Sequence, residues 1–201
     1  MSKKMKTGLY FGSFNPIHNG HLMLANYLVE YSELDCLWFV ISPQNPFKQK
    51  ESLLPDYQRL ELVNRAIEGY KKFQACDIEF SMPKPSYTID TLTYLKEKYP
   101  TREFYLIMGT DNLERLDRWK NSEQIVENYH IIVFPRNGSD GGPMKNHPNI
   151  TLVNTPIIEV SSTFIRESIQ NGNDVRFFMP EKAWEYLDEM NFYKKKKKKE
   201  E

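Results

Sequence analysis

The sequence predicts an α/β fold built on a doubly wound parallel sheet, and three observations lead to this prediction. Short apolar segments of strand length alternate with longer segments whose apolar residues recur at helical spacing. The first apolar segment passes through a glycine-punctuated turn directly into a helical pattern. Glycine, polar or basic residues follow several of the apolar segments, at the sheet edge where such folds bind ligands.

The first unit of the chain is predicted to be strand, loop and helix. Residues 6–11 (KTGLYF) form a compact apolar run, and Gly12 ends it. Pro16 sets a turn, after which residues 20–30 (GHLMLANYLVE) carry apolar side chains at helical spacing. The carboxyl end of this strand should therefore face the start of a helix.

The same alternation continues through the rest of the chain. Five further strands are expected, at residues 35–42, 73–80, 103–109, 129–135 and 150–154. Helices are expected at 55–70 and 88–100, with shorter helical segments at 112–119 and 122–128 and another helix within 158–170. This order is typical of a Rossmann-like sheet. Its ligand site should lie beyond the carboxyl ends of the strands, at Gly12, Ser42, residues 108–111 and Arg136.

Length and charge predict one folded domain. At 201 residues with 40% hydrophobic content, the chain is long enough for one sizeable core, which we place within residues 1–193. Residues 194–201 (KKKKKKEE) are predicted to be a disordered lysine-rich tail, because terminal charge blocks are usually solvated. The 27 basic and 27 acidic residues balance, but six lysines lie in this tail. The body is thus mildly acidic, which disfavours nucleic acid as a partner.

The sequence favours a cytoplasmic protein with no membrane partner. No apolar run approaches a membrane span, and the first residues lack the apolar core of a signal peptide. Cys36 and Cys76 lie in separate apolar runs, which suggests neither a disulfide framework nor a zinc site. A homo-oligomer is compatible with the sequence, which does not specify one.

Two histidines stand three residues apart where the first helix should begin. A helix N-terminus offers unpaired N–H groups and the positive end of a dipole, which together favour phosphate. His18 and His21 share one side of the first turn, so both imidazoles should face the anion and donate to a phosphoryl group in its transition state. The alternative is a pair of ordinary polar residues or a metal pair, since a lone H-x-x-H spacing is a weak signal.

A second helix start suited to phosphate occurs near the C-terminus. Ser161, Ser162 and Thr163 are candidate N-caps, and Arg166 follows in the first turns. The arginine fork can bind phosphate oxygens, and the hydroxyls can add hydrogen bonds. Taken alone, this segment could equally be an ordinary capped helix with a solvated arginine.

Both segments resemble signatures of one enzyme superfamily. GSFNPIHNGH (12–21) resembles the G-x-F-x-P-x-H-x-G-H signature of the nucleotidyltransferases, and SSTFIR (161–166) is similar to their second signature, S-S/T-T-x-I/L/V-R. Three further segments resemble bacterial nicotinate-nucleotide adenylyltransferases: KPSYTIDTL (84–92), GTDNLERLDRWKNSEQI (109–125) and, as a closing helix, MPEKAWEYLDEMNFY (179–193). The resemblance covers residues 6–193. It implies a single nucleotidyltransferase domain that transfers AMP from ATP to nicotinate mononucleotide, giving deamido-NAD and pyrophosphate in NAD biosynthesis.

The resemblance also implies the residues of the site. The catalytic residues would be His18, His21 and Arg166. ATP would be bound by these three together with Gly12, Ser13, Phe14, Gly109, Asp111, Ser161, Ser162 and Thr163. The mononucleotide would be bound by Thr88 and Trp119, and the other candidates for it are Asn45, Lys48, Lys120 and Arg136. Mg²⁺ is expected as a cofactor, held mainly by the ATP phosphates, so no metal site made by the protein is expected.

Trp119 illustrates the two interpretations of one residue. The resemblance implies that its indole stacks on the pyridine ring, which suits a flat aromatic side chain. From its spacing alone, Trp119 would instead be a core aromatic beside Leu113 and Leu116.

Two positions depart from the family pattern, and two other functions stay open. Asn15 stands where many relatives have aspartate, and Phe47 stands where a histidine is frequent. The enzyme alternative is an adenylyltransferase of the same fold that acts on nicotinamide mononucleotide or phosphopantetheine. The alternative from another class is a non-catalytic nucleotide sensor, against which the intact histidine pair and Arg166 count.

Overall fold

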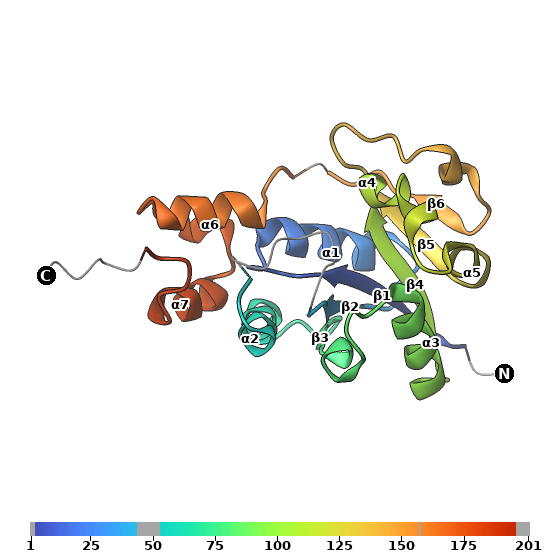
Figure 1. Ribbon diagram of the computed structural model, residues 1–201, viewed down its shortest axis with the longest axis horizontal. Coiled ribbons are helices and arrows are strands. Elements are labelled where there is room, and N and C mark those ends of the chain that lie inside the picture. The colour runs from blue at the N-terminus through green and yellow to red at the C-terminus, as the bar shows by residue number, and fades with distance from the viewer. Residues whose placement is uncertain (1–2, 44–52, 157, 196–201) are drawn as a thin grey trace, which may run out of the picture.

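The computed structural model describes residues 3–43, 53–156 and 158–195. Its centre is a six-stranded sheet in the order β3-β2-β1-β4-β5-β6, and every pairing in this sheet is parallel (Figure 1). The strands are β1 (Met5–Gly12), β2 (Cys36–Ile41), β3 (Phe73–Cys76), β4 (Arg102–Gly109), β5 (His130–Phe134) and β6 (Ile150–Leu152). This confirms the predicted doubly wound sheet, in which the strand order reverses at β1.

Strands β1, β2, β4 and β5 send alternate side chains into two hydrophobic clusters, one on each face of the sheet. Tyr10 of β1 belongs to the first cluster and its neighbour Leu9 to the second. The first cluster includes buried residues of α1 (Asn19–Tyr31), α2 (Asp56–Ile67), α6 (Ser162–Gln170) and α7 (Glu181–Glu189). The second includes buried residues of α3 (Thr88–Lys98), α4 (Thr110–Leu113) and α5 (Ser122–Asn128). Burial on both faces explains why the strands are continuous apolar runs.

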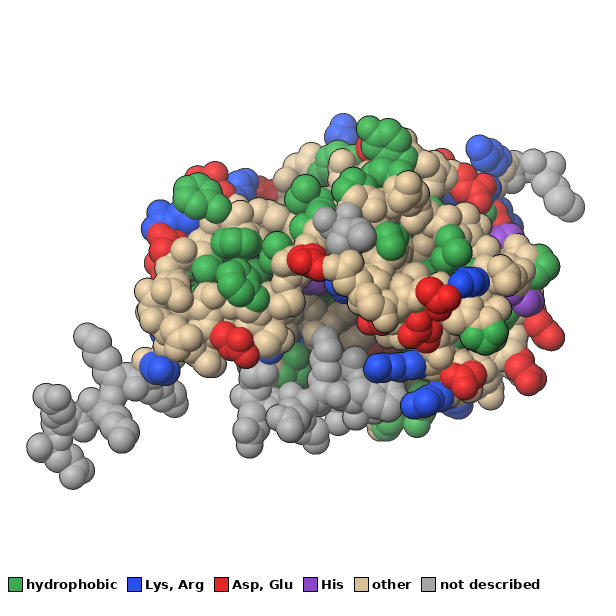
Figure 2. Space-filling view, turned by 90° about the horizontal axis from the view of Figure 1, so that it is seen from above, with side chains coloured by type: hydrophobic (Ala, Val, Ile, Leu, Met, Phe, Trp, Pro, Cys, Tyr) green, Lys and Arg blue, Asp and Glu red, His purple; other side chains and the backbone are tan. Residues whose placement is uncertain are grey.

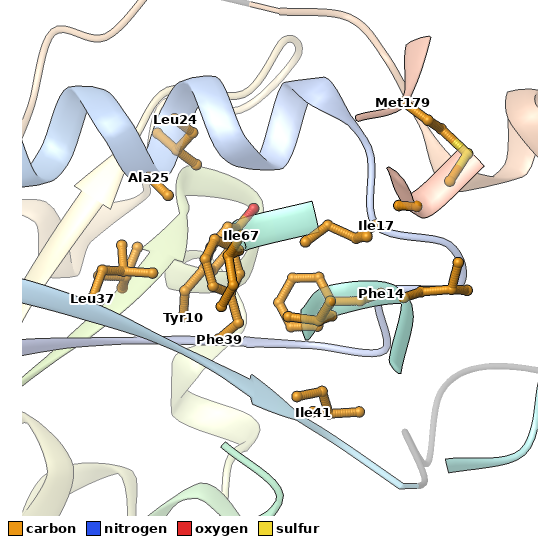
Figure 3. Packing of buried hydrophobic residues seen from close by; sticks show 14 of the residues in the cluster. Tyr10, Phe14, Ile17, Leu24, Ala25, Leu37, Phe39, Ile41, Ile67 and Met179 are labelled. Carbon is orange, nitrogen blue, oxygen red and sulfur yellow. The ribbon is translucent and has the colours of Figure 1, made fainter. Parts of the chain in front are cut away.

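The first cluster reaches up to the loop between β1 and α1. Figure 3 shows Phe14 and Ile17 of this loop beside Tyr10, Phe39 and Ile41 of the neighbouring strands. The rings of Phe14 and Tyr10 meet edge to face with their centroids 5.7 Å apart. The loop that leads to the two histidines at the start of α1 is therefore anchored in the core.

The predicted small C-terminal helical part consists of α6 and α7. These two helices lie at one end of the molecule, opposite β5 and β6 (Figure 1). The second of them, α7, packs against α2, where the Arg65 guanidinium lies over the Tyr186 ring at 4.5 Å from its centroid. No helix in the three described ranges is both long and apolar enough to cross a membrane.

Several expected elements prove shorter in the structure. The strand expected at 73–80 ends at Cys76, which pairs with Val40 near the end of β2, and a 3₁₀ helix (Ile78–Ser81) follows. The helical segment expected at 112–119 divides into α4 and a 3₁₀ helix (Leu116–Arg118). The closing helix ends at Glu189, and Asn191 and Tyr193 beyond it have φ of 53° and 62°, outside the helical region.

Candidate active site

Two cavities open at the carboxyl ends of the strands, where the topology predicts a ligand site. The first, of about 370 Å³, lies between the start of α1 and the segment that leads into α6, and includes His18. The second, of about 420 Å³, lies over the ends of β1 and β4 and reaches the start of α3. The two cavities share four of their lining residues: Tyr10, His21, Phe134 and Arg136. In Figure 2 the surface is hollowed between the C-terminal helices and the half that carries β5 and β6.

The two histidines lie together at the start of α1. Their rings stack with centroids 3.7 Å apart and planes inclined by 28°. The backbone N–H of His18 donates to Nδ1 of His21 at 3.2 Å, so a neutral His21 carries its proton on Nε2. His21 thus presents an N–H donor on the side of its ring away from the backbone.

Burial keeps His18 neutral. Its side chain is 4% exposed, and this burial lowers the pKa of the imidazole to about 3, with the positive charge of Arg136 acting in the same direction. Its Nδ1 is buried and has no hydrogen-bond partner among the described residues. A Cβ at Gly20 would lie 3.1 Å from this nitrogen, so glycine leaves room for the ring in this position.

The second signature is bonded directly to the loop that carries the first. Ser161 caps α6, its Oγ accepting from the Phe164 N–H at 3.1 Å, as predicted for this helix. The Ser162 hydroxyl donates to the Pro16 carbonyl at 2.8 Å, so its proton is engaged within the protein. Arg166 donates from Nη1 to the Asn15 carbonyl at 2.8 Å and from Nη2 to Thr163 Oγ1 at 3.2 Å. Its guanidinium is therefore oriented and keeps further N–H donors for a ligand.

The members of this signature differ in their distance from the cavities. Ser161 lines the first cavity and Ser162 lines the second. Thr163 and Arg166 are not among the described lining residues of either cavity. Arg166 contacts the loop through the Asn15 carbonyl, and Thr163 contacts Arg166.

The second cavity brings together the residues expected to bind the mononucleotide. Thr88, Trp119, Lys120 and Arg136 all line it. Thr88 is the first residue of α3, so the unpaired N–H groups and the positive dipole end of that helix lie at the cavity wall. Lys120 is engaged by Asp90, with Nζ 2.8 Å from the carboxylate, and its charge lies 4.7 Å from the centre of the Tyr87 ring.

Trp119 lies between the core and the second cavity. It packs against the second hydrophobic cluster, to which Leu113 and Leu116 belong, and it also lines the second cavity. One part of the indole is held by the core, which leaves the remainder as a fixed surface for a ligand.

Gly12, Ser13, Phe14, Gly109 and Asp111, all expected to bind ATP, line the second cavity. A Cβ at Gly109 would overlap Asp111 Oδ1 and lie 2.9 Å from Arg136 Cγ, so a larger residue would displace both side chains. Phe14 is 2% exposed and supports His21 edge to face, with ring centroids 5.2 Å apart. Asn45 and Lys48 lie outside the described residues.

Glu79 is a site residue that the sequence patterns do not reveal. It lines the second cavity although it is only 2% exposed. Its Oε1 accepts from the Thr91 hydroxyl at 2.7 Å, whereas Oε2 has no hydrogen-bond partner in the part of the chain that the structure describes. Burial raises the pKa of this carboxyl, and the hydroxyls of Thr91, Ser42 and Ser86 oppose the shift. The available signal was an acidic residue inside an apolar run expected to be a strand.

Comparisons with known proteins identify the family. Residues 9–168 match the cytidylyltransferase-like family. The chain is 52% identical to a protein of Flavobacterium johnsoniae named "Probable nicotinate-nucleotide adenylyltransferase", over 95% of this chain and 100% of that protein. It is 53% identical to a protein of the same name from Christiangramia forsetii, over 94% of this chain and 98% of that protein.

A solved structure has a similar fold. The nicotinic acid mononucleotide adenylyltransferase of Plasmodium falciparum, complexed with NaAD, superposes with a TM-score of 0.78. The two chains are 23% identical, and the match covers 94% of this chain and 97% of that one, so the likeness concerns the fold alone. From its sequence relatives, this chain belongs to the cytidylyltransferase-like family and, within it, to the nicotinate-nucleotide adenylyltransferases.

Proposed function

We propose that the chain transfers the adenylyl group of ATP to the phosphate of nicotinate mononucleotide. A phosphate oxygen of the mononucleotide attacks the α-phosphorus, the bond from that phosphorus to the β-phosphate bridging oxygen breaks, and pyrophosphate leaves with the electron pair. The products are deamido-NAD and pyrophosphate. The observation that carries this proposal is the junction of two cavities at His21 and Arg136, which suits two substrates that react where they meet.

The first cavity suits the triphosphate. The N–H of a neutral His21 and the start of α1 are donors that require no proton transfer, which fits a reaction in which the nucleophile is already anionic. His18 is kept neutral by burial and stacks behind His21. Catalysis then consists of aligning the two substrates and stabilising charge on the transferring phosphoryl group. Arg166, oriented by the Asn15 carbonyl, adds positive charge beside the same loop.

The second cavity suits the mononucleotide at the end formed by Thr88 and Trp119. Five residues expected to bind ATP line the same cavity and would face the phosphate groups where the two substrates meet: Gly12, Ser13, Phe14, Gly109 and Asp111. The indole of Trp119 offers a flat surface to the pyridine ring, and the start of α3 at Thr88 offers N–H donors to its carboxylate. Arg136, which lines both cavities, lies where the two phosphate groups would approach each other. Glu79 Oε2 and the hydroxyls of Ser42 and Ser86 would then face the polar groups of the bound substrate.

Mg²⁺ is proposed to enter on the ATP phosphates. No group of three His, Cys, Asp or Glu side chains suited to a metal ion occurs within the described ranges. The imidazole and backbone donors of the first cavity suit phosphate oxygens, and a metal already coordinated by phosphate and water needs no more. When bound, the ion would neutralise part of the triphosphate charge.

The cytoplasm is the compartment we propose for this activity. Both cysteines are free, Cys76 buried and Cys36 partly so, which agrees with a reducing environment.

A pyrophosphate-release assay tests the proposed function. Purified protein would be incubated with ATP, Mg²⁺ and one acceptor in each reaction. The three acceptors are nicotinate mononucleotide, nicotinamide mononucleotide and phosphopantetheine. We expect release that depends on nicotinate mononucleotide, together with formation of deamido-NAD. Release only with one of the other acceptors would replace the proposed substrate, and absence of release with all three would favour a nucleotide sensor.

A further inference from the structure

Asn15, one of the two positions that depart from the family pattern, has a structural role. It is 4% exposed, and its side chain is bonded within the protein. Its Oδ1 accepts from the Tyr193 hydroxyl at 2.6 Å and from the Leu54 N–H at 3.1 Å. Its backbone carbonyl is the acceptor that orients Arg166 at 2.8 Å. A single residue therefore connects the C-terminal segment to the arginine of the second signature.

Tyr193 is held in place for this contact. It follows α7 by four residues, has a φ of 62°, and packs against the first hydrophobic cluster beside the buried Phe192. A left-handed conformation is unfavourable for tyrosine and persists only where the surroundings fix it. Burial raises the pKa of the phenol well above its usual value, although the charges of Arg166 and Arg59 oppose this shift. The hydroxyl thus stays protonated and donates to Asn15 throughout the physiological pH range.

A second arginine, Arg59, holds the other side of the same loop. Arg59 is fully buried and donates to the carbonyls of Ser13 at 2.6 Å, Ser42 at 3.0 Å and Leu54 at 3.0 Å. Shortly after Ser13, Asn15 is held through its side chain by the Leu54 N–H and the Tyr193 hydroxyl. Of these two donors, Tyr193 is more distant from Asn15 in the sequence, and its hydrogen bond to Asn15 is the shorter one.

We propose that Tyr193 is a positioning residue of the ATP site, whose hydroxyl holds Asn15 so that the Asn15 carbonyl keeps Arg166 oriented. This inference rests on the proposed function in that Arg166 is taken to bind the triphosphate. The inference gives a role to Tyr193, which is not among the described residues that line the two cavities.

The test is Tyr193→Phe, which removes one hydroxyl and keeps the ring. We expect KM and Kd for ATP to rise by about three- to tenfold, the usual effect of one hydrogen bond, while KM for the mononucleotide stays unchanged. Tyr186→Phe is the matched control, because the Tyr186 ring also packs on Phe192, and it should leave both constants as in wild type. ATP binding would be measured by calorimetry without acceptor, so the result stands even if nicotinate mononucleotide proves not to be the substrate.

A double-mutant cycle separates positioning from general loosening. In Asn15→Ala the hydroxyl has lost its acceptor, so adding Tyr193→Phe should change ATP affinity no further. In Asn15→Asp the acceptor remains, so Tyr193→Phe should again weaken ATP binding. Three outcomes would overturn the proposal. Tyr193→Phe could bind ATP as tightly as wild type does, or it could weaken ATP binding in the Asn15→Ala background as much as in wild type. It could also raise KM equally for ATP and for the mononucleotide.

Discussion

His18 and His21 stack on each other, yet their surroundings assign them different parts. His21 lines both cavities, whereas His18 lines only the first of the two that the structure describes and is almost fully buried. The bond from the His18 backbone to His21 Nδ1 fixes the outer ring and its tautomer. The pair thus combines His21, whose ring lines both cavities, with the buried His18, which stacks on that ring.

Replacing either histidine with alanine should lower kcat by about 10² to 10³, the usual cost of losing one preorganised donor. Steady-state kinetics with ATP and nicotinate mononucleotide would measure this. The matched control is His130→Ala. His130 stacks on Tyr105 and is the first residue of β5, so it lies at the amino end of this strand, away from the cavities at the carboxyl ends. Near-normal turnover in both His18→Ala and His21→Ala would remove the pair from the mechanism.

The buried His18 also predicts a pH dependence of stability. Its folded pKa of about 3 lies below the unfolded value of 6.5, so the unfolded chain binds the extra proton. Its contribution is fully present above pH 6.5 and is lost as the pH falls from 6.5 toward 3. Glu79 acts in the opposite sense, because its raised pKa makes stability fall as the pH rises through its titration.

The measurement therefore compares wild type with His18→Gln by thermal unfolding between pH 7.5 and pH 5. Wild type should lose more stability on acidification than the variant does. Parallel curves for the two proteins would show that His18 is not held neutral by the fold.

At the scale of elements, most of the fold is predictable because both faces of the sheet are buried. The strands are then apolar throughout and stand out from helices with one apolar side, as β2 and α2 illustrate. The segment after Cys76 escapes this rule. Ile78 and Phe80 continue the apolar pattern, but the neighbouring strand β2 ends close to the point where Cys76 pairs with Val40. The chain therefore turns into a 3₁₀ helix, in which Glu79 is buried against Thr91.

The start of α3 predicts a preference for acid over amide. N–H donors at a helix N-terminus would pair with the carboxylate of nicotinate, whereas an amide would bring N–H groups of its own and leave some donors unpaired. We expect catalytic efficiency to favour nicotinate mononucleotide by about tenfold to a few hundredfold. Equal efficiency with both acceptors would contradict this preference and leave adenylyl transfer untouched.

Trp119 should serve both mononucleotides equally, because stacking does not distinguish acid from amide. Trp119→Ala should raise KM for both and leave their ratio unchanged, while Trp119→Phe, which keeps a flat ring, should retain most of the affinity. A change in KM for ATP alone would mean that the indole does not lie on the acceptor side.

At the scale of the whole molecule, the site depends on contacts between distant parts of the chain, which sequence patterns do not provide. Each signature predicts its own helix start, and Ser161 caps α6 as expected. The bonds from Ser162 to Pro16 and from Tyr193 to Asn15 join residues more than a hundred positions apart. They depend on how α6 lies against the loop after β1 and on how α7 packs against α2, and this information lies in packing.

Truncation at two neighbouring points tests the reach of this assembly. Removal of residues 194–201 should leave kcat, KM and the thermal midpoint within error, since the contacts given for Lys194 are to the exposed Asp188 and Asn191 of its own segment. Removal of Tyr193 as well should raise KM for ATP at least as much as Tyr193→Phe. Equal behaviour of the two truncations would mean that Tyr193 has no part in the site.

Because the loop after β1 is held by side chains from the last helices, the protein acquires its catalytic geometry late. During synthesis on the ribosome, the first strand and helix emerge early, whereas Arg166 and Tyr193 are among the last residues to emerge, and a domain generally folds as a unit. The contacts of Arg166 and Tyr193 with the loop before His18 and His21 could then form only after almost the whole chain has left the exit tunnel. Recovery of ATP affinity during refolding would accordingly report the final docking step of the fold, after the sheet has formed.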